Sequence, residues 1–265
     1  MIRYSYMLID EREVFANDLQ GFLNLIKASG YEGIELNLTP GLLGQLDRVE
    51  SAVQASDLTV PSFLTGAAYT EGLCFASPDA DVRRRTVERL ISYLDIARRF
   101  DAILVVGLLQ GLRSDEADTD TANERIAACL RQVARAAENQ AVELVVEPVN
   151  HLQVGFNNSV GEVRQLIERI GSPAFKPMVD TVHMNIEETS MLQPIRDCGT
   201  NLRHVHLCES NGGLLGSGNI DFGAVLHTLD EIGYDGFASA KIYRNATHKQ
   251  AITTSLEYLN QQRSN

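Results

Sequence analysis

The sequence predicts an α/β fold, a single (β/α)8 TIM barrel that spans residues 1–265. Eight short apolar or β-branched runs recur roughly every 30 residues, the usual length of a βα unit, and helix-period stretches lie between them. No motif typical of an antiparallel hairpin joins two runs. Alternating strands and helices indicate a parallel sheet, and eight units close a barrel. An open, doubly wound sheet is the alternative, which is disfavoured because no glycine-rich dinucleotide loop follows the first run.

Strands of a parallel sheet covered by helices are expected to be nearly all apolar, so charged residues inside or at the end of a run are the informative ones. Two of the turns that lead into the predicted strands have a similar sequence, Gly30-Tyr-Glu-Gly33 and Gly233-Tyr-Asp-Gly236, and each is expected to end a helix and turn tightly into a strand. The eight runs are residues 2–8, 33–38, 58–64, 103–108, 143–149, 175–183, 202–208 and 237–243.

Two of the intervening helices carry clear signals of where they begin. Ser159 and Glu162 have the spacing of a capping box, in which each side chain accepts a hydrogen bond from the other's backbone N–H. Gly171 is expected to end this helix, because glycine tolerates the left-handed conformation found there. Asp221 is expected to cap the helix that precedes the last strand.

Composition excludes several classes of protein. The chain has 23 basic and 35 acidic residues, a net charge of −12, which is unfavourable for nucleic acid. Neither an export signal nor a membrane-spanning stretch is expected, since the longest strongly apolar run, residues 102–109, is far shorter than a bilayer requires. The four cysteines are widely spaced and form no CxxC pair, so a reduced, cytoplasmic protein is expected.

Four polar residues lie in or at the ends of four successive predicted strands: Glu147, Asp180, His206 and Lys241. Active sites of parallel barrels lie at the carboxyl ends of the strands, so these side chains are expected to meet at one rim. Two carboxylates and an imidazole suit a divalent cation such as Mn²⁺, Mg²⁺, Co²⁺ or Zn²⁺. Glu147, Asp180 and His206 are therefore the predicted metal ligands. A buried ion pair for Glu147, a loop cap for Asp180 and a hydrogen-bonded core histidine for His206 remain the structural alternatives.

Six stretches of the chain carry a family resemblance. The sequence resembles the xylose isomerase-like TIM barrel superfamily, which holds ketose epimerases, hydroxypyruvate isomerase, inosose isomerases and dehydratases, and endonuclease IV. The matching stretches follow the family order: 30–36 (GYEGIEL), 145–150 (VVEPVN), 179–188 (VDTVHMNIEE), 204–211 (HVHLCESN) with 216–222 (GSGNIDF), and 233–239 (GYDGFAS). The endonuclease reading is disfavoured, because the third and fourth strands carry no histidines for additional zinc ions and the net charge is acidic.

The resemblance implies roles for individual residues. Glu147 matches a metal ligand that also exchanges a proton with the sugar, and Asp180 and His206 match two further ligands. The residues that match or lie near the family's substrate-contacting positions are His183, Glu35, Asn150, Gln153 and Glu209. A small carbohydrate substrate is implied, with a homo-oligomer as an option, since family members often form dimers or tetramers.

The chain departs from the family pattern at three positions. The fourth metal ligand, a glutamate that is the second acid/base of the epimerases, is replaced by Lys241; Gln153 and Gly212 replace a substrate-contacting glutamate and an arginine. Ketose 3-epimerase activity is therefore doubtful. Three roles stay open for Lys241: the counter-ion of a metal-free site, a general acid beside a metal held by the other three residues, or an amine that forms a Schiff base.

The sequence thus predicts an isomerase or epimerase-like enzyme that acts on a small keto or aldehyde carbohydrate or polyol through a metal-stabilised enediolate. Glu147 is the predicted base, Lys241 the acid and His183 a substrate contact. The alternatives are a metal-free sugar-binding barrel without catalysis and a lyase or dehydratase of the same superfamily. The loop 211–219 is expected to be a turn-rich lid, with a phosphate-binding loop as its alternative.

Overall fold

The predicted fold class is confirmed by the computed structural model, which describes residues 1–264. The strands follow one another in chain order and close a parallel barrel. They are β1 (Arg3–Met7), β2 (Gly33–Asn37), β3 (Ser62–Leu64), β4 (Ile103–Val106), β5 (Leu144–Val146), β6 (Phe175–Asp180), β7 (His204–Leu207) and β8 (Phe237–Ala240).

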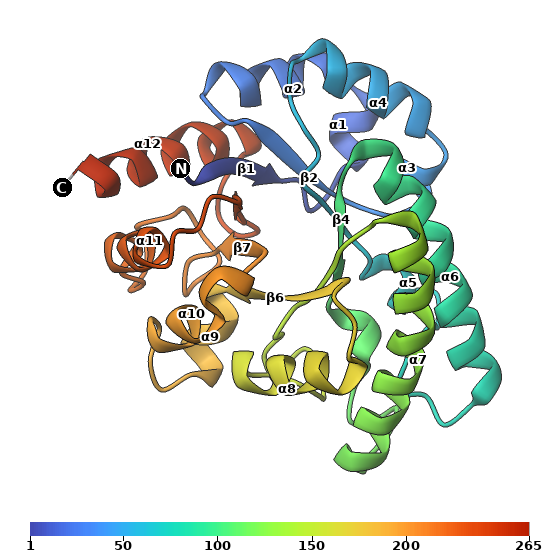
Figure 1. Cartoon of the computed structure of the whole chain (residues 1–265). Coiled ribbons are helices and arrows are strands. Elements are labelled where there is room, and N and C mark those ends of the chain that lie inside the picture. Colours follow the sequence, from blue (N-terminus) through green and yellow to red (C-terminus); the bar gives the residue numbers. More distant parts are fainter. Residues whose placement is uncertain (265) are drawn as a thin grey trace. The chain divides into compact units, whose positions relative to one another are not determined.

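Helices connect the strands, as βα units require (Figure 1). The α-helices are α1 (Arg12–Ala16), α2 (Leu19–Ala28), α3 (Pro40–Leu43), α4 (Leu46–Ala55), α5 (Ala67–Thr70), α6 (Ala80–Phe100), α7 (Thr119–Gln140), α8 (Val160–Ile170), α9 (Thr181–Glu187), α10 (Gln193–Cys198), α11 (Phe222–Glu231) and α12 (His248–Ser264), and the 3-10 helices are η1 (Leu108–Gln110) and η2 (Gly199–Asn201). Within residues 1–264, no helix combines the length and the apolar character needed to cross a bilayer.

The chain divides into two compact units. The first comprises Met1–Leu36, Pro40–Pro61 and the chain from Val179 onward, and the second comprises Asn37–Thr39 and Ser62–Met178. In the second unit, β4 pairs with β3 and β5, and a core forms from Ile103, Val105, Val145 and Met178 with Leu64 packed against it. The long helices α6 and α7 lie side by side in this unit (Figure 1).

The first unit has a polar strand interior. Here β1 pairs with β2 and β8, and β8 pairs with β7, so that Ser5 lies opposite Ser239, and Ser239 opposite His206. Ser5, Ser239, His204 and His206 are 1% exposed or less. Buried polar side chains require partners, so this interior must form a connected hydrogen-bond network.

The sixth predicted strand is too long at its end. Strand β6 ends at Asp180, and α9 starts at the next residue, because the Asp180 Oδ1 atom accepts a hydrogen bond from the Val182 N–H and caps the helix. His183 therefore lies on a helix rather than on a strand. The strand prediction missed this change because Thr181 and Val182 are β-branched residues, which are also typical of strands.

The predicted helix limits are confirmed. The Ser159 N–H donates to Glu162 Oε2 (3.0 Å) and the Glu162 N–H donates to Ser159 Oγ (3.2 Å), a complete capping box at the start of α8. Gly171 ends the helix with φ = 70°. At the start of α11, the Asp221 carboxylate accepts from the Ala224 N–H at 2.9 Å.

Replacing Ser159 with alanine is expected to lower the free energy of unfolding by about 1 kcal/mol, because one backbone N–H of α8 loses its partner. Ser159→Thr keeps the hydroxyl and should retain most of that stability. Urea denaturation of the three proteins measures the difference. Equal stability of the alanine variant and the wild type would show that the capping box contributes nothing to folding.

Candidate active site

Asp180 lies at the centre of a buried polar cluster in the first unit. Its side chain is fully buried, and its Oδ2 atom is 2.6 Å from the Lys241 Nζ atom and 3.2 Å from His206 Nδ1. His183 Nε2 is 3.7 Å from the same oxygen. The structure thus brings together four residues that the sequence singled out, three of them predicted from successive strand ends.

Backbone pairing explains how these side chains meet. The Lys241 N–H donates to the Leu207 carbonyl at 2.9 Å, which continues the β7–β8 ladder by one residue and places Lys241 beside the end of β7. Thr181 fixes the start of α9 to the same place, because its hydroxyl donates to the Cys208 carbonyl (2.7 Å) and accepts from the Cys208 N–H (2.8 Å). Thr181 was not predicted, since a threonine after a helix cap has no special signal in a single sequence.

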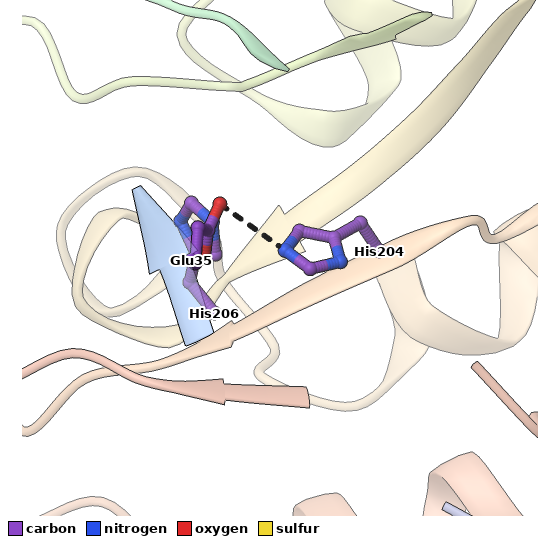
Figure 2. Close-up of side chains that lie close together, drawn as sticks. All are labelled: Glu35, His204 and His206. Atoms are coloured by element: carbon purple, nitrogen blue, oxygen red, sulfur yellow. Dashed lines mark hydrogen bonds and ion pairs between the residues drawn. The ribbon is translucent and has the colours of Figure 1, made fainter. Parts of the chain in front are cut away.

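Figure 2 shows the second part of the cluster, in which Glu35 of β2 faces two histidines of β7. The Glu35 Oε1 atom is 3.1 Å from His206 Nε2 and 3.4 Å from His204 Nε2. All three side chains are 1% exposed or less, and the two rings stand nearly perpendicular, at 89°. Glu35 therefore contacts histidines; its predicted role in substrate binding stays a prediction.

The network continues into the barrel interior through His204. Its Nε2 atom is 3.4 Å from Ser239 Oγ, and that hydroxyl is 2.7 Å from Ser5 Oγ. This arrangement gives His204 the polar partners that a buried imidazole needs. His204 is thus a buried, hydrogen-bonded histidine of the strand interior.

Burial and charge act in opposite directions on these groups. Burial alone would raise the pKa of Asp180, but the Lys241 ammonium, His183 and His206 hold it well below its usual range. Burial would also raise the pKa of Glu35, and the two histidines at its carboxylate hold it well below the usual value. Burial lowers the pKa of His204 against the opposing effect of Glu35. Two ionised carboxylates beside a neutral His204 are the state that this geometry favours.

The second unit holds the predicted residues of the fifth strand. Glu147 directly follows β5 and is 7% exposed. Its carboxylate packs against Gly107, where a Cβ atom would lie only 2.6 Å from it. Asn150 is buried, and its Oδ1 atom accepts from the Leu152 N–H. Gln153 is exposed. Gln110, which was not predicted, is fully buried and donates to the Glu147 carbonyl at 3.1 Å.

Glu209 is buried beneath the loop that follows β7. Its Oε2 atom accepts from the Ser210 N–H (2.6 Å) and the Ile220 N–H (3.4 Å), which joins the two ends of the loop 211–219. A Cβ atom at Gly218 would lie 2.5 Å from this oxygen, so the close approach requires glycine. Glu209 holds the loop in place, and its predicted contact with substrate stays a prediction.

The donor atoms around Asp180 suit a divalent cation in type and spacing. A carboxylate oxygen and an imidazole nitrogen are ligands common to Mn²⁺, Co²⁺ and Zn²⁺, and two ligands of one ion lie about 3 Å apart. Asp180 Oδ2 and His206 Nδ1 are 3.2 Å apart. The same oxygen already receives the Lys241 ammonium, so a cation held here would share Asp180 with Lys241.

The model of the xylose isomerase-like TIM barrel family matches residues 23–262. The chain belongs to this family, and the predicted resemblance is confirmed.

Several relatives are sugar epimerases. L-ribulose 3-epimerase of Mesorhizobium japonicum is 32% identical over 68% of this chain, a match that spans 64% of that protein and therefore less than two thirds of its length. Ketose 3-epimerase of Arthrobacter globiformis is 28% identical over 79% of this chain and 72% of its own. The solved structure of an L-ribulose 3-epimerase has a TM-score of 0.80 at 25% identity and covers all of this chain and 96% of that one. The apo form of 3-keto-D-glucoside 4-epimerase from E. coli shares the fold, with a TM-score of 0.85 at 20% identity over 98% of this chain and 100% of that chain.

Replacing Lys241 with methionine is expected to lower the free energy of unfolding at pH 7 by about 3 kcal/mol, because the buried Asp180 carboxylate loses its ammonium partner. The pKa of Asp180 in the folded state then rises. A depressed carboxyl pKa stabilises the fold above the unfolded value of about 3.9, and that stability is lost only as the pH falls through the folded pKa. The deficit of the variant should therefore be full near neutral pH and shrink below about pH 4.

Lys249→Met, at an exposed position of α12, is the matched control and should change stability by less than about 0.5 kcal/mol. Denaturant titrations between pH 2 and pH 8 provide the measurement. A Lys241 variant as stable as the wild type at every pH would contradict the ion pair.

Proposed function

We propose that this protein is a sugar isomerase that moves a proton between adjacent carbons of a small keto or aldehyde carbohydrate or polyol through an enediolate. The observation that carries the proposal is the buried cluster of Asp180, His183, His206 and Lys241 in a barrel of the xylose isomerase-like family. Strand ends of such barrels are the usual place for catalysis. The relatives named as epimerases support a carbohydrate substrate.

Proton transfer is assigned to Glu147 and Lys241. Glu147 lies at the end of β5, the strand that precedes Asp180 in the barrel order, and would remove the proton from carbon. The Lys241 ammonium would donate to the substrate oxygen that gains negative charge. His183, on α9 beside Asp180, would contact a substrate hydroxyl, and Glu35, Asn150, Gln153 and Glu209 are the further candidates for substrate binding.

A divalent cation, Mn²⁺, Mg²⁺, Co²⁺ or Zn²⁺, would be held by Glu147, Asp180 and His206. When bound, such a cation polarises the carbonyl and acidifies the neighbouring C–H bond. The carboxylate and imidazole donors fit this group, and the two that lie in the first unit have the appropriate spacing.

Isomerisation is preferred to 3-epimerisation because of Lys241. Epimerisation requires a proton to leave one face of the enediolate and another to arrive on the opposite face, which normally takes two bases. Lys241 is held at 2.6 Å from Asp180 as an ion pair, so it serves as an acid toward oxygen rather than as a second carboxylate base. Elimination of water from the same enediolate, a lyase reaction, uses the same groups.

A second candidate function is a sugar-binding barrel that works without a metal and without catalysis. The observation in its favour is the Lys241–Asp180 pair itself, since an ammonium satisfies a buried carboxylate without any ion. All four cysteines are buried and outside any disulfide bond, which supports the proposed cytoplasmic location. No nucleic-acid or membrane partner is proposed, and a homo-oligomer stays a prediction.

Incorporation of solvent deuterium into a sugar distinguishes the two candidate functions, because only the enzyme would catalyse it. In D₂O with Mn²⁺, the wild type is expected to label the carbon next to the carbonyl of L-ribulose or D-psicose, as observed by NMR. Glu147→Gln should reduce the labelling rate by at least about 100-fold, because it removes the base. Removal of metal with EDTA should also abolish labelling.

Glu124→Gln, an exposed change on α7, is the matched control and should label at the wild-type rate. If the wild type binds sugar in calorimetry but shows no labelling, the proposed enzyme activity is wrong and the sugar-binding function is favoured. Labelling unaffected by Glu147→Gln would remove that residue from the catalytic role.

A further inference from the structure

We propose that Gln110 is a positioning residue that fixes the backbone of Glu147, the proposed base, and thereby sets where the Glu147 carboxylate lies at the end of β5. The catalytic meaning of this inference rests on the proposed function, whereas the hydrogen bonds behind it are a property of the folded second unit. Gln110 is the last residue of η1, and its side chain is fully buried. Its contact is with the Glu147 carbonyl, so it acts through that residue.

The backbone of Glu147 is hydrogen-bonded on both sides of its Cα atom. Its N–H donates to the Val106 carbonyl at 2.9 Å, which continues the pairing of β4 with β5 past the end of the strand. Its carbonyl accepts from the Val149 N–H at 3.0 Å and from Gln110 Nε2 at 3.1 Å. With both peptide groups fixed, the direction of the Cα–Cβ bond is fixed as well, and with it the start of the side chain.

The orientation of the Gln110 amide follows from its partners. A backbone carbonyl only accepts hydrogen bonds, so Gln110 must turn its NH₂ group toward Glu147 and its oxygen away from it. On the far side, Asn157 Nδ2 donates to Gln110 Oε1 at 2.9 Å and to Asn123 Oδ1 at 3.0 Å. A flipped Gln110 amide would bring two oxygens together at Glu147. The row of amides Asn123, Asn157 and Gln110 therefore has one direction and ends at the proposed base.

Asn157 supports Gln110 from an ordered loop. Its φ of 52° lies in the left-handed region, which asparagine adopts more readily than most other residues, and its side chain is 6% exposed. The next residue, Asn158, donates from Nδ2 to the Val149 carbonyl at 2.7 Å and to the Val154 carbonyl at 2.9 Å. These bonds close the loop between β5 and α8 on itself, so the amide behind Gln110 is held in place.

The segment that carries Gln110 also limits the Glu147 carboxylate. A Cβ atom at Gly107 would lie 2.6 Å from Glu147 Oε2 and 3.6 Å from Glu147 Cβ. A side chain at position 107 would therefore displace the carboxylate. The segment 107–110 thus contacts Glu147 at both ends, at the carboxylate through Gly107 and at the carbonyl through Gln110.

A purely structural role for Gln110 is the alternative interpretation. The loops after β4 and β5 are also joined without it, because the Gly155 N–H donates to the Gly111 carbonyl at 2.9 Å and the Arg113 guanidinium lies 5.1 Å from the centre of the Phe156 ring. A buried amide must be hydrogen-bonded to be tolerated, whereas an apolar side chain would fill the same space without that demand. What Gln110 adds is a hydrogen bond to the backbone of the proposed base, which is the basis for assigning it a positioning role.

The kinetics of deuterium labelling of L-ribulose in D₂O with Mn²⁺ test the assignment. Gln110→Met, which has a similar length and no amide, is expected to lower kcat about 10–100-fold and to change KM less than about 3-fold, because a displaced base slows proton removal without weakening sugar binding. Asn157→Gly keeps the left-handed backbone but removes the amide behind Gln110, and should lower kcat about 3–10-fold. The double variant should be no slower than Gln110→Met alone, because both changes act through one contact.

Amide hydrogen exchange followed by NMR gives a readout that does not depend on catalysis. The Val149 N–H shares the Glu147 carbonyl with Gln110, and the Leu90 N–H in the middle of α6 reports the stability of the unit as a whole. In both single variants, the exchange rate of Val149 should rise at least about 10-fold more than that of Leu90. Ser159→Ala, which loses a helix cap in the same unit, is the control: it should keep the wild-type kcat and raise both exchange rates equally.

A Gln110→Met variant with the wild-type kcat would overturn the proposal, as would single losses that multiply in the double variant or an equal loss of kcat in Ser159→Ala. If Gln110→Met does not fold, Asn157→Gly decides by the same two measurements. A wild type that labels no sugar, with the expected exchange pattern in the variants, refutes the proposed function alone. A wild type that labels sugar, with Val149 exchange that only follows Leu90 in both variants, refutes the positioning role alone.

Discussion

The candidate site depends on one buried oxygen, Asp180 Oδ2, which receives the Lys241 ammonium at 2.6 Å and the His206 ring at 3.2 Å. A charge with no exposure to water is tolerated only if partners of opposite charge and hydrogen bonds surround it. Three elements of the chain converge to supply them: the end of β6 with α9, strand β7, and the residue after β8. Asp180 thus links these three elements through its side chain.

Two layers of polar groups follow from this constraint. The outer layer, Asp180, Lys241 and His183, lies at the strand ends, where a sugar and a cation would be held. The inner layer, Glu35, His204, Ser239 and Ser5, lies within the strands and contacts the outer one through His206. His206 therefore contacts both layers, Asp180 through Nδ1 and Glu35 through Nε2.

The sequence predicted the fold class and most of the site because both depend on patterns of period and spacing. Strand runs separated by helix-period stretches identify βα units, and polar residues at the ends of apolar runs identified Asp180, His206 and Lys241. The pattern failed where hydrogen bonds outweigh hydropathy: Asp180 ends β6 by capping α9, so His183 lies on a helix. Contacts between distant segments were also beyond the sequence, as with Thr181, which binds the backbone of Cys208, and Glu35, which faces two histidines of β7.

Lys241 is one of three positions at which this chain is expected to depart from the family pattern, and its ion pair with Asp180 is the interaction on which the candidate site depends. A double-mutant cycle that combines Asp180→Asn with Lys241→Met tests it most directly, with the free energy of unfolding as the measured quantity. Because each single change leaves a buried partner unsatisfied, the double variant should be more stable than the sum of the single losses predicts, with a coupling energy of about 2–3 kcal/mol. Losses that add within about 0.5 kcal/mol would show that the two side chains do not interact and would contradict the account.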